Sequence, residues 1–195
     1  MSERPAILAL DLSLTATGWA CGSISGVLKA NDARAVNRLC LIRNAVLRLV
    51  RNEHTEPMGL VVLEGYAFGR LNQAHQLGEL GGVVRVALHE AGVPVAIVPP
   101  SSLKMFATGK GNAPKDQMLA EAVRVLGYQG HDHNEADARW LWTMAQAHYR
   151  GVRMPNQKQR DALAKIRWPV LSRSPEESSC KDLSSGLTTR RATGS

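Results

Sequence analysis

The stretch that decides the fold is ILALDLSLTATGWA, residues 7–20. An apolar run that is typical of a buried strand ends in Asp11, and small and hydroxylated residues follow it at once. A carboxylate at the end of a buried strand is costly unless a cation or hydrogen-bond donors compensate its charge. Taken alone, Asp11 is best interpreted as a turn residue that caps the backbone after it. Acids at comparable places elsewhere would instead indicate a metal ligand or a catalytic acid.

The segments around Asp11 alternate as the elements of an α/β domain do. Residues 6–13, 17–24 and 26–30 predict three strands in the order of an antiparallel meander. Continuously apolar stretches predict two further strands buried between helices, at residues 58–66 and 94–100. Helices are expected over residues 33–52, 72–92, 101–127 and 134–150, the third of them interrupted by a Gly-rich basic loop.

The first of these helices, residues 33–52, is amphipathic. We expect its apolar side to consist of Val36, Leu39, Leu41, Ile42, Val46, Leu49 and Val50. Its arginines lie largely on the other sides, and a solvated basic face is the simplest interpretation of them.

Two more acids stand at places comparable to that of Asp11. Glu64 ends the apolar run of the fourth predicted strand, and Asp137 lies near the start of the last predicted helix. Taken alone, an acid at a helix start is typical of capping, because the helix N-terminus favours negative charge. Capping does not account for a set of three acids that includes two strand ends.

Helical spacing decides which neighbours can share the site of Asp137. Positions three and four residues apart lie on one helix face, so Asn134 and His133 can point the same way as Asp137. Glu135 is directed away from it.

Three carboxylates from two strands and a helix indicate a site for a divalent ion with hard oxygen ligands. Mg²⁺ is the natural ion, with Mn²⁺ as a substitute. Two ions held roughly 4 Å apart can activate water and stabilise the leaving oxygen of a phosphodiester. The sequence therefore predicts phosphodiester hydrolysis.

Composition sets the outer limits. The chain has 195 residues, 44% of them hydrophobic, so we expect one domain over residues 1–150 and a basic extension over residues 151–195. No apolar run approaches the roughly 20 residues that span a bilayer, and no secretory signal pattern is found at the N-terminus. The three cysteines are too widely spaced for a disulfide framework or a zinc site. A soluble, cytoplasmic protein without a membrane partner is expected.

The extension carries most of the excess positive charge. It holds nine Lys and Arg residues against four Asp and Glu, in a chain of net charge +7. Residues 155–168 predict a short basic helix, and the residues after it have the composition of a disordered segment. Contact with a polyanion and a purely solubilising role are equally compatible with this composition.

A second basic segment, LKMFATGKGNAPKDQM at residues 103–118, lies before the last helix. Its glycines permit a close approach of the backbone, and Lys104, Lys110 and Lys115 provide cations for phosphate. The alternative is an exposed flexible loop, since the spacing differs from that of a P-loop.

Four segments taken in order resemble those of a known family. They are ALDLSLTATGWA (9–20), VVLEGYAFGR (61–70) with HQLGELGG (75–82), PPSSLKMFATGKGNAPKDQM (99–118) and NEADARWLW (134–142). Over about residues 5–148 the chain resembles the RuvC-like Holliday junction resolvases, particularly those of bacteriophages, within the ribonuclease H-like superfamily. The resemblance implies an α/β ribonuclease H-like fold. Its mixed five-stranded sheet would join a three-strand antiparallel meander to parallel strands, with helices on either side.

The resemblance also implies a set of metal ligands. Magnesium would be bound by Asp11, Glu64 and Asp137. The family commonly has a fourth ligand, Asp or His, three residues before the last acid, where this chain has Asn134. Asn134 could coordinate through its amide oxygen, His133 could substitute for it, or Asp132 could act through a bent helix start. His131 and Asp132 are otherwise interpreted as loop residues.

The DNA-binding residues implied by the resemblance are Phe68, Arg70, Lys104, Lys110 and Lys115. Lys104 and Lys115 would contact DNA near the scissile phosphate, and Lys115 would stabilise the charge of the transition state. Phe68 would act as a wedge or stack against opened base pairs, although Tyr66 and Phe68 are equally acceptable as core aromatics.

Three hypotheses about function remain open from the sequence. The first is a homodimeric, magnesium-dependent endonuclease that cleaves four-way DNA junctions, because symmetric incision needs two sites related by a two-fold axis. The second is another ribonuclease H-like nuclease, acting on flaps, branches or RNA:DNA hybrids. The third is a nucleic-acid binder whose metal site is inactive because of Asn134.

Overall fold

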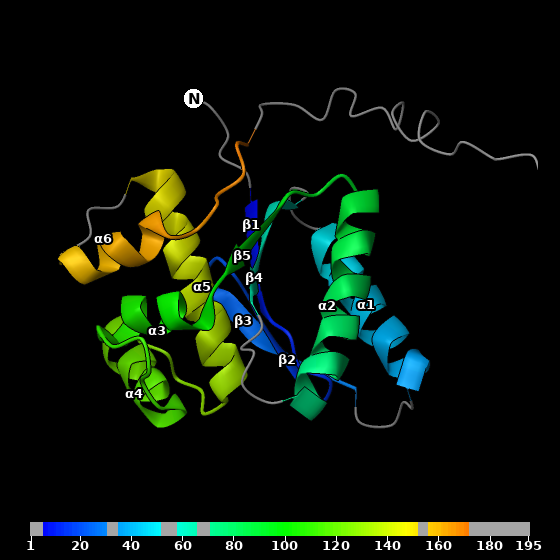
Figure 1. The fold of residues 1–195 in the computed structure, drawn as a ribbon, viewed down its shortest axis with the longest axis horizontal. Helices are drawn as coiled ribbons and strands as arrows, with labels where there is room; N and C mark the ends of the chain where they lie inside the picture. Colours follow the sequence, from blue (N-terminus) through cyan, green and yellow to red (C-terminus); the bar gives the residue numbers. More distant parts are fainter. Residues whose placement is uncertain (1–5, 31–34, 52–57, 66–70, 152–155, 172–195) are drawn as a thin grey trace, which may run out of the picture.

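A computed structural model describes residues 6–30, 35–51, 58–65, 71–151 and 156–171 of the chain. These residues form one sheet with helices on both faces (Figure 1). The strands are β1 (Ala6–Asp11), β2 (Ala16–Cys21), β3 (Ile24–Lys29), β4 (Met58–Glu64) and β5 (Val95–Val98). The helices are α1 (Ala35–Arg51), α2 (Leu71–Glu90), α3 (Pro100–Thr108), α4 (Lys115–Leu126), α5 (His133–Arg150) and α6 (Gln157–Ala164).

The sheet has five strands in the order β3-β2-β1-β4-β5. The pairs β1–β2 and β2–β3 are antiparallel, whereas β1–β4 and β4–β5 are parallel. The predicted mixed sheet with its antiparallel meander is therefore confirmed. Several strand boundaries differ from prediction by one to three residues, most of all at the turn between β2 and β3. Gly22, with a φ of 63°, supplies the left-handed backbone of a tight turn, so β2 ends at Cys21 and β3 begins at Ile24.

Side chains that alternate along the strands build two hydrophobic layers. Ile7 and Ala9 of β1 belong to the layer covered by α3, α4, α5 and α6, whereas Leu8 and Leu10 belong to the layer covered by α1 and α2 (Figure 1). Asp11 continues the series of Ile7 and Ala9. The end of β1 therefore presents its carboxylate to the layer that contains α5.

Helix α1 buries a narrower stripe than its sequence predicts. Ile42, Val46 and Val50 are buried at a spacing of four residues, but Val36 and Leu41 are 68% and 52% exposed. Each residue turns a helix by about 100°, so Leu41 lies well off the stripe centred on Ile42 and Val46. The expectation that Val36 and Leu41 belong to the buried side is wrong.

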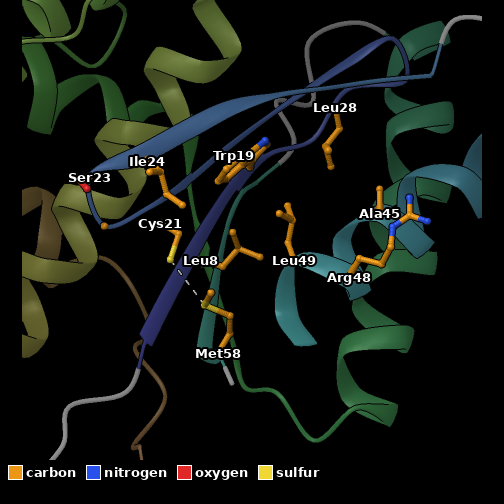
Figure 2. A pocket seen from close by; sticks show the side chains of 11 residues that line it. Leu8, Trp19, Cys21, Ser23, Ile24, Leu28, Ala45, Arg48, Leu49 and Met58 are labelled. Atoms are coloured by element: carbon orange, nitrogen blue, oxygen red, sulfur yellow. Dashed lines mark hydrogen bonds between the residues drawn. The ribbon is translucent and has the colours of Figure 1, made fainter. Parts of the chain in front are cut away.

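The same layer contains a cavity of about 480 Å³ between the meander and α1. Figure 2 shows Leu8 and Met58 beside Leu49 of α1 at this cavity, with Arg48 as its charged lining residue. The cavity is largely apolar, and it lies on the face of the sheet opposite to the carboxylates. It contains no acid, which separates it from the site described below.

Part of the basic extension packs on the core. Helix α6 contacts α3, and Ala162 and Ile166 are buried in the same cluster as Phe106. After α6, the Trp168 ring stacks on His148 of α5 with ring centroids 4.7 Å apart. The short helix predicted in the extension is present. The division of the chain at residue 150 stays a prediction, and residues 172–195 lie outside the described part.

Candidate metal centre

Three carboxylates from three separate elements meet at one end of the sheet. Asp11, Glu64 and Asp137 each offer one oxygen, and these oxygens lie within 4.8 Å of one another. Strands β1 and β4 are parallel neighbours, with Leu10 paired to Leu63, so the acids that follow these residues emerge side by side. Helix α5 crosses the same face of the sheet and brings Asp137 to them. The predicted convergence of the three acids is found.

A close backbone contact places the start of α5 on the sheet. A β-carbon built on Gly18 of β2 would lie 2.0 Å from the carbonyl oxygen of Asn134, much closer than real atoms approach. The side-chain nitrogen of Asn134 donates a hydrogen bond of 2.6 Å to the carbonyl oxygen of Ala16. The first turn of α5 therefore rests directly on the backbone of β2, three residues before Asp137.

Two acids near the helix start have structural partners. Asp132 is the N-cap, and its Oδ1 accepts hydrogen bonds from the backbone N–H groups of Asn134 (2.9 Å) and Glu135 (3.0 Å). Glu135 points away from the site, as predicted, and accepts hydrogen bonds from Ser25 Oγ (2.7 Å) and Tyr128 OH (3.0 Å). Asp132 lies in the loop directly before α5, as predicted, and its side chain also satisfies free N–H groups of the helix.

Burial and mutual repulsion make the charged forms of the three carboxylates unfavourable. Burial, together with the charge of Glu64 and a hydrogen bond to it, raises the pKa of Asp11 well above its usual value. Burial and the charge of Glu64 raise the pKa of Asp137 to about 7. Burial also raises the pKa of Glu64, but its hydrogen bond with Asp11 opposes the shift. Clustered buried acids of this kind favour either a proton or a cation between them.

Two lysines of the basic segment lie within electrostatic reach of the acids. Lys115, the first residue of α4, lowers the pKa of all three carboxyls, and Lys104 of α3 lowers those of Glu64 and Asp137. Both act against the larger effect of burial. Lys110 lies in the turn between α3 and α4, where its side chain is exposed. The predicted helix interrupted by a Gly-rich basic loop is present as α3, the turn that contains Lys110, and α4.

The residues present fit a divalent cation. Carboxylate oxygens are the ligands that Mg²⁺, Mn²⁺ and Ca²⁺ prefer. Oδ1 of Asp137 is buried and has no hydrogen-bond partner among the described residues, so it is an acceptor without a donor. Burial raises the pKa of Asp11 and Asp137 in spite of the opposing charge of Lys115. A metal ion would supply the missing positive charge.

The remaining ligand candidates lie in different surroundings. Nε2 of His133 is 3.6 Å from Oδ1 of Asp116 on α4, and within the described residues His133 does not belong to the group of acids. Asn134 uses its amide nitrogen on Ala16, which leaves its Oδ1 as the atom it can offer to a cation. Phe68 and Arg70 lie outside the described residues.

We expect Asn134→Asp to lower the free energy of unfolding of the metal-free protein by about 1–3 kcal/mol. An aspartate cannot donate to the Ala16 carbonyl and would set two acceptors against each other at this contact. Urea unfolding in EDTA measures the loss, with Asn112→Asp in the exposed turn as the control. If Asn134 faces the cation, added Mg²⁺ will recover part of the loss. Equal unfolding curves for the variant and the unchanged chain would contradict the structural role of this hydrogen bond.

Sequence reasoning missed the residues that fix α5 in place. Gly18, Tyr128 and Ser25 are not candidates for catalysis or metal binding. They support the site through contacts between distant segments of the chain. Gly18 alone had a signal, because a glycine inside a strand often marks a close backbone approach.

Comparison with known proteins places the chain in a family. The model of the family described as crossover junction endodeoxyribonuclease RuvC matches residues 14–145. The RuvC of Hyphomonas neptunium is 31% identical over 164 residues, which cover 79% of this chain and 97% of that protein. The RuvC of Anaeromyxobacter sp. (strain Fw109-5) is 34% identical over 115 residues. That match spans 58% of this chain and only 55% of the relative's length.

Solved structures agree with this assignment. A Thermus thermophilus RuvC structure has a TM-score of 0.60 and 26% identity, covering 75% of this chain and 96% of that chain. T. thermophilus RuvC in complex with Holliday junction substrate has a TM-score of 0.59 and 23% identity, which shows the likeness of the fold. The expected ribonuclease H-like fold and the resemblance to RuvC-like resolvases are confirmed. The chain belongs to the RuvC family of crossover junction endodeoxyribonucleases.

Proposed function

We propose that the chain is a metal-dependent endonuclease that hydrolyses phosphodiester bonds in branched DNA, with the four-way Holliday junction as its main substrate. The observation that carries the proposal is the group of three carboxylates within 4.8 Å on a RuvC fold. The relatives are crossover junction endodeoxyribonucleases by name, and T. thermophilus RuvC has been solved in complex with a Holliday junction substrate, both of which support this substrate. Recombination or the processing of phage DNA in the bacterial cytoplasm is the expected setting.

Mg²⁺ is the proposed ion, two per site, with Mn²⁺ as a substitute. Asp11, Glu64 and Asp137 would hold the ions, and Oδ1 of Asn134 is the proposed fourth ligand, with His133 as the alternative. When bound, such ions supply Lewis-acid activation and compensate charge at a phosphodiester. The protein's own part is to hold three buried acids close together, on two strands and a helix.

The lysines on α3 and α4 are proposed to act on the DNA. Lys115 lies where its charge reaches all three carboxylates, so it is placed to stabilise negative charge that develops on the reacting phosphate. Lys104 is proposed to bind the DNA strand beside the scissile bond, and Lys110 to bind a more distant phosphate. Phe68 and Arg70 remain proposed DNA contacts, with Phe68 as the wedge.

We expect Lys115→Ala to lower the cleavage rate by about 10²-fold and to weaken junction binding much less, because its charge acts mainly in the transition state. Lys104→Ala should weaken binding at least as much as it slows cleavage. Single-turnover cleavage and equilibrium binding, measured on the same junction, separate these effects. Lys29→Ala removes the same charge from the exposed end of β3 and is the control. Equal, small effects in all three variants would mean that this segment is merely an exposed surface.

A homodimer is part of the proposal. A four-way junction has two strands to cut at related positions, and two copies of the chain related by a two-fold axis would present two sites in matching orientation. Sedimentation of the free chain and of its complex with a junction measures the stoichiometry. Two chains per junction are expected.

The proposal is tested by cleavage of four-way, three-way, flap, linear and RNA:DNA hybrid substrates in Mg²⁺ and in EDTA. We expect Mg²⁺-dependent cleavage that is fastest on the four-way junction. Preference for flaps or hybrids would instead indicate another ribonuclease H-like nuclease. Junction binding without cleavage in either Mg²⁺ or Mn²⁺ would indicate an inactive binding protein.

A further inference from the structure

We propose that a second phosphate-binding surface lies on residues 157–167, which comprise α6 and the three residues after it. This surface would bind a DNA arm away from the cleaved bond. The inference rests on the proposed function. The matched family region ends at residue 145, before α6 begins, so this surface lies beyond the part of the chain that the family model covers.

The surface is attached to the layer of helices that contains α3 and α5. Nε2 of Gln159 donates to the carbonyl oxygen of Phe106 in α3 at 3.3 Å, and Nζ of Lys158 donates to that of Gly109 at 3.2 Å. Ala162 and Ile166 are buried against the same layer. The exposed side of α6 therefore has a fixed position relative to α3.

The segment's continuation is fixed as well. The indole nitrogen of Trp168 donates to the carbonyl oxygen of Leu163 at 3.2 Å, and its ring stacks on His148 of α5. Tyr149 donates through its hydroxyl to the carbonyl oxygen of Pro169 at 2.7 Å. Both ends of the surface are thus attached to other helices, which distinguishes it from a loose basic tail.

The exposed side of this segment is strongly basic. Four basic residues, Lys158, Arg160, Lys165 and Arg167, are exposed, against the single acid Asp161. Asp161 accepts a hydrogen bond of 2.6 Å from Nε2 of Gln157. Among the described residues no carboxylate forms an ion pair with Lys165 or Arg167. Exposed cations such as Lys165 and Arg167, on a segment whose backbone is fixed, suit a polyanion with regularly spaced charges, as a DNA backbone has.

The position of α6 relative to the acids suggests which phosphates it meets. Helix α3 begins directly after β5, whose Val98 pairs with Glu64, and ends at α6. Its nine residues span about 13 Å. The basic residues of α6 are therefore proposed to meet phosphates other than the one that is cleaved. The charge of Lys104 on α3 reaches Glu64, and Lys110 directly follows Gly109, whose carbonyl oxygen accepts a hydrogen bond from Lys158 of α6. Basic residues therefore occur near the acids, at the end of α3 and on α6.

The test compares two double variants of the full chain in a Glu64→Gln background that binds without cutting. Lys165→Ala with Arg167→Ala removes two exposed cations that form no ion pair with any described residue. Arg48→Ala with Arg51→Ala removes two exposed cations from α1, in the opposite layer, and is the matched control (Figure 1). Thermal unfolding checks that both variants fold. Affinity for a four-way junction is measured across a salt series, and hydroxyl-radical footprints are recorded.

The α6 variant should lower the slope of log affinity against log salt by about 1.8, since each lost phosphate contact removes about 0.9. It should also lose footprint protection at phosphates away from the cut site, while the α1 variant changes neither quantity. An unchanged slope, or an equal fall in both variants, overturns the inference and leaves α6 as a packing element or a surface for another partner. Failure of the proposed function is a different result, in which the unchanged chain neither binds junctions nor cuts them.

Discussion

Asp11→Asn, Glu64→Gln and Asp137→Asn will each slow cleavage by about 10³-fold or more, and each will leave junction binding close to that of the unchanged chain. Each substitution removes a negative charge that would hold the metal, and a loss of about 4 kcal/mol in transition-state stabilisation corresponds to that factor. None removes a cation from the surfaces proposed to bind phosphate. Single-turnover cleavage and binding in Ca²⁺ measure the two quantities. Near-normal turnover in any variant would remove that residue from the catalytic set.

The same three variants should unfold less easily than the unchanged chain when no metal is present. Each replaces a buried acid whose pKa is raised, so each relieves charge repulsion and the cost of burying a carboxylate. We expect a gain of about 1–3 kcal/mol in the free energy of unfolding at pH 8, in EDTA. Glu79→Gln, an exposed acid on α2, is the control and should change little. Inactive variants that are also less stable would point to general damage of the fold.

Removal of divalent ions will stop cleavage, and at pH 8 it will also lower the melting temperature by several degrees. The sign follows from Asp137, whose pKa is raised to about 7 in the folded chain from 3.8. A raised carboxyl pKa makes the folded state the better proton binder, so the metal-free protein gains stability as the pH falls from about 8 towards 4. A bound metal replaces that proton, and its stabilising effect is largest at high pH.

Melting curves with Mg²⁺ or Mn²⁺ and with EDTA, recorded at pH 5 and pH 8, measure this effect. The difference between metal and EDTA should be large at pH 8 and small at pH 5, where protons already occupy the acids. Asp137→Asn should remove most of the difference at pH 8. A metal effect that is equal at both pH values would show that the ions bind somewhere other than the three carboxylates.

Much of the fold followed from local signals in the sequence. Each strand of the meander is short and apolar, and the two strands buried on both faces read as continuous apolar runs. Asp11 and Glu64 could be placed at one end of the sheet because each interrupts such a run at its last position. Asp137 could be placed near them because capping, which explains an acid at a helix start, does not explain a set of three acids that includes two strand ends.

The rest depended on contacts that no local pattern encodes. Val36 and Leu41 are apolar but exposed, because only the packing of α1 decides how wide its buried stripe is. The sequence offers Asn134 as a ligand, yet its amide nitrogen donates a hydrogen bond to the carbonyl oxygen of Ala16, more than a hundred residues earlier in the chain. The partner of His133, Asp116, likewise belongs to another helix. These pairings arise from the tertiary arrangement alone.

The contact between Gly18 and the start of α5 has a consequence for anyone who would transplant this site. The three acids could be grafted onto another five-stranded sheet at equivalent strand and helix positions. The helix would then stand off from the second strand unless that strand also lacked a side chain at the point of contact, and Asp137 would withdraw with it. A working graft must therefore include four positions: the three acids and a glycine at the place of Gly18.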